Sequence, residues 1–358
     1  MKQGMKPKNK ILYLVNQFSM HGGIQKMLSL KIDAWQNYYD AEVVVVTISQ
    51  GDAPIVYPPK HSFKFIDLNL PGINKHKWKE ILKFRKELKR IFKTEKPDIV
   101  ITTLTGIPSL ILPLISPKTK KVLEIHSSGA LSVSKSWRYK WFFLRRYYKV
   151  VLLNEDEKHY YELDNTTVIP NFIEITDSDF PYFSDRKKRI IAAGRVHPDK
   201  QYGHLLKIWE QLYKEFPEWN LEVYGNGDKR LLQMYNDEIS NLKLKRINFF
   251  PATNELQNLL RESSIFILCS DTECFPMVLI ECKSAALPAI SYDSPNGPRH
   301  IISDDGILVE HNDIEKFAEE LAALMKDEEK RKELSKRSWN NRFRFSDIEI
   351  IKKWEELL

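Results

Sequence analysis

Short apolar runs alternate with amphipathic stretches along the whole chain. Continuous apolar runs of a few residues are typical of strands buried on both faces, and stretches with one apolar side are typical of the helices that cover them. The alternation therefore predicts a parallel sheet flanked by helices. In the first half, strands are expected at Ile11–Val15, Glu42–Ile48, Lys64–Ile66, Asp98–Thr103, Lys121–Ile125 and Val150–Leu153, and helices at Ile24–Trp35 and Trp78–Phe92.

The same pattern restarts after the segment Val168-Ile169-Pro170-Asn171. Two such halves predict an α/β fold with two Rossmann-like domains facing a cleft, residues 1–170 and residues 171–344. A long helical region is expected at Ile314–Arg342, and the amphipathic end, 345–358, is expected to pack back on the first domain. The strands expected in the second half are Arg189–Gly194, Asn220–Gly225, Ile247–Phe250, Ile265–Ser270, Pro288–Ser291 and Gly306–Val309.

Charge is distributed unevenly over the 358 residues, whose formal net charge is +7. Residues 1–180 contain 28 basic and 18 acidic residues, whereas residues 181–358 contain 27 and 30. A basic half indicates a surface that meets phosphates, either in lipid headgroups or in nucleic acid.

The cysteines and the apolar runs bear on the cellular compartment. Cys269, Cys274 and Cys282 form no CxxC pair and have no histidine cluster nearby, so they are interpreted as buried thiols in a reducing compartment. Ile11–Val15 is too short for a signal peptide, and Ile99–Ile115 is interrupted by glycine and proline. We therefore expect a cytoplasmic protein without a transmembrane helix, which can only lie on the inner face of a membrane.

Gly22 and Gly23 follow the first expected strand and open a helix. Glycine lets the backbone come close to a ligand, and a helix N-terminus favours an anion. The pattern is not GxGxxG, so it does not indicate a nicotinamide cofactor. An ordinary loop remains the alternative.

Gly194-Arg195 ends another expected strand, and Lys200 follows five residues later near the start of a helix. Two cations at one strand end can hold a diphosphate and neutralise a leaving nucleotide without a metal. Taken alone, two solvated surface charges would be the simpler interpretation.

The segment from Glu273 to Glu281 reads ECFPMVLIE. Pro276 suits the first turn of a helix, whose free N–H groups would point toward a phosphate. Glu273 can reach a sugar hydroxyl, and Glu281 on an apolar helix needs a partner such as a ribose diol. The alternative for Glu281 is a solvated position.

His126 lies just past the expected strand Lys121–Ile125, in the segment EIHSSG. At this edge of a sheet it can touch a transferred sugar or its phosphate. A lone histidine is more often structural, and the residue gains weight only beside the other segments.

Together these residues resemble the GT-B glycosyltransferases of family 4, also called glycosyl transferases group 1, over nearly the whole chain. Glu273…Glu281 is similar to the E-x7-E motif of that family, and Gly194-Arg195…Lys200 to its diphosphate clamp. Gly22-Gly23 is similar to its N-domain glycine loop. The order and spacing of these segments make chance agreement improbable.

The resemblance implies a retaining transferase that moves a hexose or N-acetylhexosamine from a nucleotide sugar, with uridine as the expected base and no metal or other cofactor. The acceptor would be a lipid-linked or oligosaccharide chain in cell-surface polysaccharide synthesis. Arg195 and Lys200 would hold the diphosphate, Glu281 the ribose and Glu273 the sugar hydroxyls, while His126 would contact the transferred sugar. The remaining donor-binding residues implied are Gly22, Gly23, Gly225, Phe275, Met277 and Val278.

Two features bear on this resemblance. Pro276 stands where many family members have glycine, which removes one backbone N–H from the donor site. The loop Ser291–Ile301 is similar to that of members that use UDP-hexoses or UDP-N-acetylhexosamines.

Residues 135–149 mix basic and aromatic side chains in the order KSWRYKWFFLRRYYK. Tryptophan and tyrosine favour the headgroup zone of a membrane, and Lys and Arg attract anionic lipid. The segment therefore predicts contact with an anionic membrane surface. A core helix with basic flanks and an RNA-binding patch are the alternatives, and no RNA-binding motif accompanies the segment, so no nucleic-acid partner is expected.

Two other functions are compatible with this fold. A nucleotide-sugar epimerase would release a free sugar without an acceptor, but the Arg195/Lys200 pair together with the E-x7-E frame argues against it. A non-catalytic scaffold module is the second alternative, and the intact set of charged residues argues against decay. Nucleotide release that depends on an acceptor would discriminate among the three.

Overall fold

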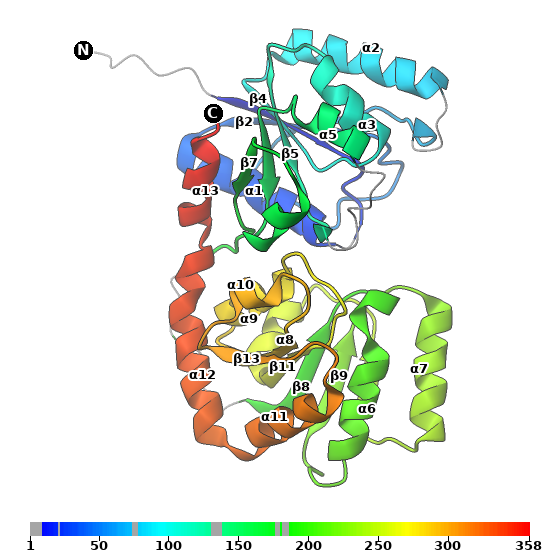
Figure 1. The fold of residues 1–358 in the computed structure, drawn as a ribbon, viewed down its shortest axis with the longest axis vertical. Helices are drawn as coiled ribbons and strands as arrows, with labels where there is room; N and C mark the ends of the chain where they lie inside the picture. Colours follow the sequence, from blue (N-terminus) through cyan, green and yellow to red (C-terminus); the bar gives the residue numbers. More distant parts are fainter. Residues whose placement is uncertain (1–8, 21, 74–77, 130–137, 176–179, 181–185) are drawn as a thin grey trace, which may run out of the picture. The chain divides into compact units, whose positions relative to one another are not determined.

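The computed structural model describes residues 9–20, 22–73, 78–129, 138–175, 180 and 186–358. The chain forms two compact units. Unit 1 contains Met1–Glu174 and Asp347–Leu358, and unit 2 contains Ile175–Ser346. Each unit has one parallel sheet covered by helices, so the predicted class of two parallel-sheet α/β domains is confirmed (Figure 1).

The sheet of unit 1 has the order β3-β2-β1-β4-β5-β6-β7. The pattern of apolar runs does not predict β7, because three residues of sequence TTV are too short to stand out. Pairing of Val150 with Thr166 and of Leu152 with Val168 makes this segment a strand. The strands are β1 (Lys10–Val15), β2 (Glu42–Thr47), β3 (Lys64–Asp67), β4 (Ile99–Thr102), β5 (Lys120–Glu124), β6 (Lys149–Leu152) and β7 (Thr166–Val168).

Alternate residues of β1 point to opposite faces of this sheet. Leu12 packs in a core cluster with Phe84, whereas the hydroxyl of Tyr13 accepts a hydrogen bond from Trp35 Nε1 at 2.8 Å. α1, which carries Trp35, and α2, which carries Phe84, therefore cover different faces. The helices of unit 1 are α1 (Gly23–Tyr39), α2 (Trp78–Glu95), α3 (Ile107–Ile111), α5 (Arg138–Leu144) and α13 (Asp347–Glu355), with 3-10 turns η2 (Leu112–Leu114) and η4 (Asp156–Tyr160).

The C-terminal helix α13 lies beside α1 in unit 1 (Figure 1). Tyr38 donates a hydrogen bond to Asp347 Oδ2 at 3.0 Å, and Tyr39 donates one to Glu355 Oε2 at 2.9 Å. The two ends of α13 are therefore tied to α1. Among the described residues of either unit, no helix is both long and apolar enough to cross a membrane.

The sheet of unit 2 has the order β10-β9-β8-β11-β12-β13, with every pair parallel. β8 lies between β9 and β11, so the loops that follow these three strands are neighbours. The strands are β8 (Lys187–Ala193), β9 (Asn220–Tyr224), β10 (Ile247–Phe250), β11 (Ser263–Leu268), β12 (Ala289–Tyr292) and β13 (Gly306–Val309).

The helical region expected at Ile314–Arg342 is divided at Asp327. The carboxylate of Asp327 accepts a hydrogen bond from the Lys330 backbone at 2.9 Å, which caps the second helix. The helices of unit 2 are α6 (Tyr202–Leu212), α7 (Lys229–Asn241), α8 (Leu256–Glu262), α9 (Met277–Ser284), α10 (Pro298–Ile301), α11 (Ile314–Lys326) and α12 (Glu328–Asn341), with 3-10 turns η5 (Pro198–Lys200) and η6 (Arg342–Phe345).

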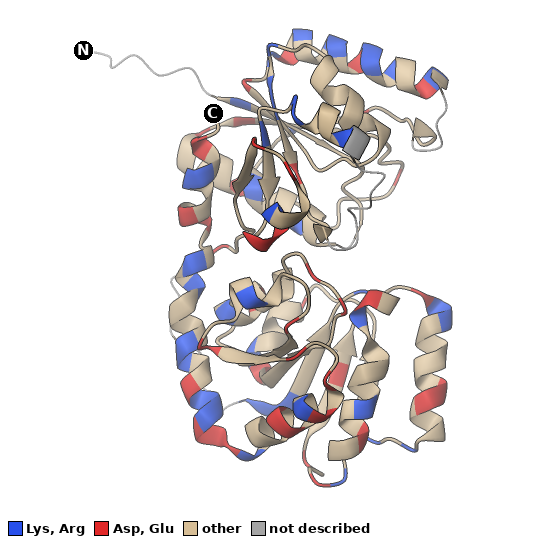
Figure 2. Ribbon diagram, viewed as in Figure 1, with Lys and Arg blue, Asp and Glu red and all other residues tan. Residues whose placement is uncertain are grey.

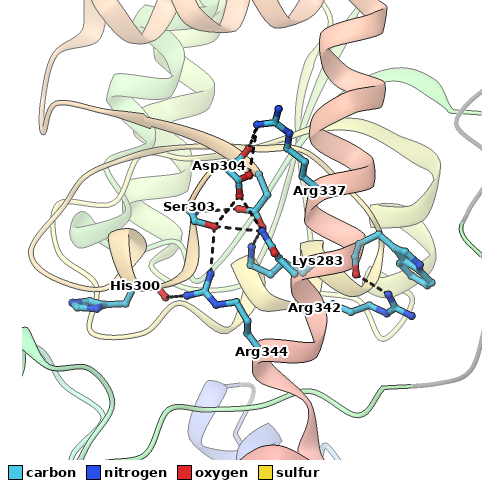
Figure 3. A network of polar contacts seen from close by, with 10 residues as sticks. Lys283, His300, Ser303, Asp304, Arg337, Arg342 and Arg344 are labelled. Atoms are coloured by element: carbon cyan, nitrogen blue, oxygen red, sulfur yellow. Dashed lines mark hydrogen bonds and ion pairs between the residues drawn. The ribbon is translucent and has the colours of Figure 1, made fainter.

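A polar network joins α9, the turn before β13 and the end of α12 (Figure 3). Lys283 and Asp305 form an ion pair whose side chains are 3% and 1% exposed. Asp305 also accepts hydrogen bonds from the Ser303 backbone at 3.1 Å and from Asn341 Nδ2 at 3.0 Å. Arg344 extends the network to the carbonyl oxygen of His300 at 3.3 Å. α9 is thereby anchored to two segments that are distant in sequence.

Candidate functional site

Four of the predicted site residues lie at one edge of the unit 2 sheet. Arg195 follows β8, Gly225 follows β9 and Glu273 follows β11. Lys200 ends η5, directly before α6, and Arg195 is exposed. This is the edge at which open parallel sheets bind ligands.

Lys200 and Glu273 form an ion pair through Nζ and Oε1, although 73 residues separate them. Ser270 donates a hydrogen bond to the same carboxylate oxygen at 2.8 Å. The loops that carry the pair are joined by a backbone hydrogen bond from Asp271 N to Asp199 O at 2.8 Å. An ammonium and a carboxylate held together suit a ligand with an anionic group beside hydroxyls, because the cation binds phosphate oxygens and the carboxylate accepts from hydroxyls.

Gly225 and Gly227 let two backbone segments approach closely after β8 and β9. A Cβ at Gly225 would lie 1.8 Å from the carbonyl oxygen of Gly194, and a Cβ at Gly227 would lie 2.2 Å from that of Val196. Gly194 N donates to Tyr224 O at 3.0 Å, and Val196 N donates to Asn226 O at 3.0 Å. The two glycines thus fix the path of the backbone that carries Arg195.

The carbonyl of Gly194 is held from the other side as well. The hydroxyl of Tyr202, the first residue of α6, donates to it at 3.1 Å. Burial raises the pKa of Tyr202, so the hydroxyl stays protonated and remains a donor.

α9 carries the second half of the E-x7-E segment. It begins at Met277, with Pro276 as an extended N-cap residue. Met277 and Val278 form its first turn and are partly exposed, whereas Glu281 is only 6% exposed. A solvated position for Glu281, which the sequence left open, is therefore excluded.

The side chain of Phe275 is buried rather than presented at the sheet edge. Its ring packs edge-to-face on Phe345, with ring centroids 5.7 Å apart. A donor-binding role is expected for Phe275 from the sequence, and the packing leaves only its backbone for a ligand.

The loop after β12 holds the backbone of Glu273. Glu273 N donates to Pro295 O at 3.0 Å, and the amides of Asn296 and Gly297 donate to Glu273 O at 2.9 Å and 2.8 Å. The sequence points to the loop Ser291–Ile301, but it does not identify Asn296 and Gly297 within that loop, nor Ser270 and Gly227. These four residues are small or polar, and each lies at the end of a predicted strand or in the loop that follows one, which is the one sequence feature that they share.

Unit 1 places its predicted site residues at the carboxyl edge of its own sheet. Gly22 caps α1 in an extended conformation, with φ −172°, and a Cβ there would meet only the end of the flexible Gln25 side chain. The fold therefore does not itself require glycine at position 22, and Gly23 is the first residue of α1. His126 follows β5, with Nε2 lying 3.1 Å from Glu124 Oε1.

The basic and aromatic segment 135–149 is divided between core and surface. Residues 135–137 lie outside the described residues. Trp141 packs against the unit 1 core, and Leu144 and Tyr147 are buried in it. Phe142 is 59% exposed, with the guanidinium of Arg146 lying 3.6 Å from its ring centroid. The alternative of a core helix with basic flanks thus describes much of the segment.

Comparisons with known proteins relate both units to sugar transferases. Residues 175–340 match the family described as glycosyl transferases group 1. The chain is 26% identical to the amylovoran biosynthesis glycosyltransferase AmsD of Erwinia amylovora, over 98% of this chain and 99% of that protein. It is 29% identical, over 76% of each chain, to the GalNAc-α-(1→4)-GalNAc-α-(1→3)-diNAcBac-PP-undecaprenol α-1,4-N-acetyl-D-galactosaminyltransferase of Campylobacter jejuni.

A solved structure has the same fold along the full length. A TarM variant from S. aureus, in complex with fondaparinux, α-GlcNAc-glycerol and UDP, aligns with a TM-score of 0.82 at 14% identity, over 98% of this chain and 99% of that one. The match to the family, the named relatives and the shared fold lead to one assignment. This chain is a glycosyltransferase with the two parallel-sheet domains of the GT-B fold, and its residues 175–340 match the glycosyl transferases group 1 family.

Proposed function

We propose that the chain is a retaining hexosyltransferase that moves a hexose or N-acetylhexosamine from a UDP-linked sugar to a lipid-linked or saccharide acceptor. The names of the relatives support this proposal, since they include an enzyme of amylovoran biosynthesis and one that acts on a PP-undecaprenol glycan. UDP is the nucleotide in the TarM complex. Synthesis of a cell-surface polysaccharide is the process that fits these substrates.

One observation carries the proposal, namely the Lys200–Glu273 pair at the strand ends of unit 2. A nucleotide sugar presents an anionic diphosphate next to neutral hydroxyls, and the pair presents the complementary ammonium and carboxylate. Lys200, with the exposed Arg195 in the same connection between β8 and α6, binds the diphosphate.

The same cations act in catalysis. Negative charge grows on the diphosphate as the sugar departs, and fixed cations stabilise this charge more in the transition state than in the bound donor. Glu273 orients the sugar through its hydroxyls, Glu281 on α9 binds the ribose, and His126 of unit 1 acts on the transferred sugar.

Removal of either charge from the Lys200–Glu273 pair should distinguish the role of Lys200 from that of Glu273. Lys200→Met removes a charge-assisted contact of about 1.5–3 kcal/mol, so the Kd for UDP should rise roughly 10- to 100-fold while uridine affinity stays the same. Glu273→Gln should tighten UDP binding, because the ammonium of Lys200 loses its internal partner and becomes fully available to the diphosphate. Isothermal titration with UDP and uridine, with and without a chelator, measures both effects.

Lys187→Met is the matched control, because Lys187 forms an exposed pair with Glu262 at the opposite end of β8. Its UDP affinity should equal that of the wild type. Unchanged UDP affinity in Lys200→Met would remove Lys200 from the donor site. No binding of UDP by the wild type would refute the proposed donor itself.

We also propose that unit 1 binds an anionic membrane surface, which places the protein on the inner face of the cell membrane. α2 contains seven basic and three acidic residues, and its basic residues are distributed along the helix (Figure 2). Trp78 and Leu82, one turn apart, are 77% and 63% exposed. Exposed Phe142 adds an apolar side chain from the segment 135–149. Apolar side chains among basic residues are the pattern of helices that lie in a lipid interface.

Replacing both exposed apolar residues of α2 should weaken this contact. Trp78→Ser/Leu82→Ser removes about 2 kcal/mol or more of apolar burial, so the partition constant onto phosphatidylglycerol vesicles should fall roughly 30-fold. Met234→Ser is the control, because Met234 is 63% exposed on α7 of unit 2. Sedimentation with vesicles measures binding, and equal binding by the double variant and the wild type would exclude α2 as the contact.

A further inference from the structure

A buried chain of polar side chains in unit 1 ends at His126. Lys31 of α1 and Glu124, the last residue of β5, form an ion pair in which each side chain is 2% exposed. His126 Nε2 lies 3.1 Å from the same carboxylate oxygen, Oε1, and its side chain is 10% exposed. The three groups therefore lead from the interior of the unit to the edge of its sheet.

The C-terminal helix completes this cluster. The ring centroid of Trp354 lies 3.9 Å from Lys31 Nζ, so the ammonium is held over an aromatic face. Trp354 is fully buried, and the contacts of Tyr38 and Tyr39 fix the two ends of its helix. Trp354 of α13 thus covers the Lys31 end of the Lys31–Glu124 pair.

Stability does not by itself account for such a pair. The free energy needed to remove two charges from water is about as large as the free energy gained from their attraction. Apolar side chains of similar volume often stabilise a fold equally well. Here the carboxylate also binds a histidine at the edge where the sheet meets ligands. These observations favour a role in setting the state of that histidine.

The charge of Glu124 determines which nitrogen of His126 carries a proton. Burial acts to raise the pKa of Glu124, but the charge and the hydrogen bond of Lys31 oppose burial, and the pKa of this carboxyl is lowered. An ionised carboxylate can only accept hydrogen bonds, so Nε2 must be protonated. In a neutral ring, Nδ1 then bears the lone pair.

Lys31 determines the net charge of the buried group beside the His126 ring. With Lys31 present, the buried partner of the ring is a neutral ion pair. Without it, the partner is a bare carboxylate in a poorly solvated position, which stabilises a neighbouring cation strongly. Loss of Lys31 would therefore convert the ring to imidazolium and turn Nδ1 from an acceptor into a donor.

We propose that Lys31, Glu124 and Trp354 are positioning residues that keep His126 neutral with Nε2–H bound to Glu124, so that Nδ1 accepts a hydrogen bond from a sugar or acceptor hydroxyl. This inference rests on the proposed function for the use of His126, but the state of the ring is tested without it. Glu124 orients the ring and selects its tautomer, Lys31 cancels the charge of Glu124, and Trp354 holds Lys31.

Nitrogen NMR of the imidazole in the full chain tests the state of the ring. The His126 signals are assigned by their loss in His126→Asn. At pH 7.5 the wild type and Glu124→Gln should show a neutral ring with protonated Nε2, because the amide oxygen of glutamine still accepts. Lys31→Met should show both nitrogens protonated. A neutral ring in Lys31→Met, identical to that of the wild type, would overturn the proposal.

The double variant Lys31→Met/Glu124→Gln is the control for misfolding of the single variant, because it leaves no unpaired buried charge. It should return His126 to the neutral state with Nε2 protonated, and an imidazolium in this variant would also overturn the proposal. Trp354→Leu should shift the ring toward imidazolium, whereas Trp354→Phe, which keeps an aromatic face, should retain the wild-type state.

Release of UDP from UDP-glucose, UDP-galactose and UDP-N-acetylglucosamine, measured with a polyprenyl-diphosphate-linked sugar as acceptor, tests the link to catalysis. Loss of a group that orients a reactive residue costs roughly 10- to 100-fold in activity. Lys31→Met should lose that factor in kcat with the donor KM nearly unchanged, and the double variant should recover most of it. An imidazolium in Lys31→Met together with wild-type kcat would overturn the catalytic part. No UDP release by the wild type, with the expected nitrogen signals, would refute the proposed function and support the positioning of the ring.

Discussion

Replacement of Gly225 by alanine is expected to lower the melting temperature of unit 2 by on the order of 10 °C and to abolish UDP binding. The added Cβ would lie 1.8 Å from the carbonyl oxygen of Gly194. That oxygen belongs to the backbone and cannot move aside as a side-chain end can, so the strand extension must separate. Overpacking of this kind costs about 3 kcal/mol.

The loss of binding follows from the same displacement. Gly194 immediately precedes Arg195, and its amide bonds to Tyr224 O while its carbonyl accepts from Tyr202. Separation of these groups moves the backbone of Arg195 away from the strand end. Differential scanning calorimetry and UDP titration measure the two consequences in one protein preparation.

Gly203→Ala is the matched control. Gly203 lies in α6, and a Cβ there would be 3.9 Å from Tyr235, an ordinary contact. Alanine at a helical position is favoured over glycine by about 0.5–1 kcal/mol, so this variant should melt slightly higher and bind UDP normally. Normal melting and binding in Gly225→Ala would contradict the close approach of the two strand ends.

Lys283→Met is expected to destabilise unit 2 by about 3–5 kcal/mol, because it leaves the carboxylate of Asp305 buried without its cation. The Ser303 and Asn341 hydrogen bonds remain but carry no compensating full charge. Urea denaturation followed by the fluorescence of Trp209 and Trp219 in the unit 2 core reports the change.

A double-variant cycle separates the pair from its surroundings. Lys283→Met/Asp305→Asn removes both charges and keeps an oxygen for the Ser303 amide, so it should recover more than half of the lost stability. Arg337→Met is the control, because its pair with Asp304 is exposed and screened by solvent, so its loss should change the stability very little. A Lys283→Met protein as stable as the wild type would show that the pair is not buried as described.

The pH dependence of the single variant Asp305→Asn gives an independent check. Burial lowers the pKa of Lys283, and Asp305 opposes this effect. Without Asp305 the pKa falls further below the usual value, so between the folded and unfolded pKa values the unfolded chain binds more protons. The stability of Asp305→Asn should therefore rise as the pH increases from 7 toward 10, more steeply than that of the wild type.

The sequence predicts most of the strands because each prediction needs only neighbouring residues. The predicted runs Glu42–Ile48 and Ile265–Ser270 are apolar enough to be buried on both faces, whatever their partners are, and they overlap the strands β2 and β11. β7 is the exception, since TTV becomes a strand only through its pairing with β6. Division of the helical region at Asp327 is local too, but an aspartate cap is hard to distinguish from a solvated acid within a charged stretch.

The candidate site is predicted as residue types and completed only by topology. The E-x7-E spacing and the Gly-Arg segment are local patterns, and the sequence identifies both. The pairing of Lys200 with Glu273 depends on β8 lying next to β11 in the sheet, and Gly227 acquires its role only because two strand extensions run side by side. Phe275 has the sequence position of a donor-site residue, yet its side chain packs on Phe345.

The sequence by itself thus determined the fold class, the resemblance to glycosyl transferases group 1 and the set of charged residues at the strand ends, because hydrophobic periodicity and motif spacing are properties of adjacent residues. Only the tertiary structure decided which charges meet, which are buried and which side chain holds another in place. The chain Lys31–Glu124–His126 with Trp354 illustrates this limit, because its members come from α1, from β5 and the loop after it, and from the C-terminal helix. Contacts across such distances are set by strand order, by the alternation of side chains between the faces of a sheet, and by the return of the chain end to unit 1, none of which is encoded within any one segment.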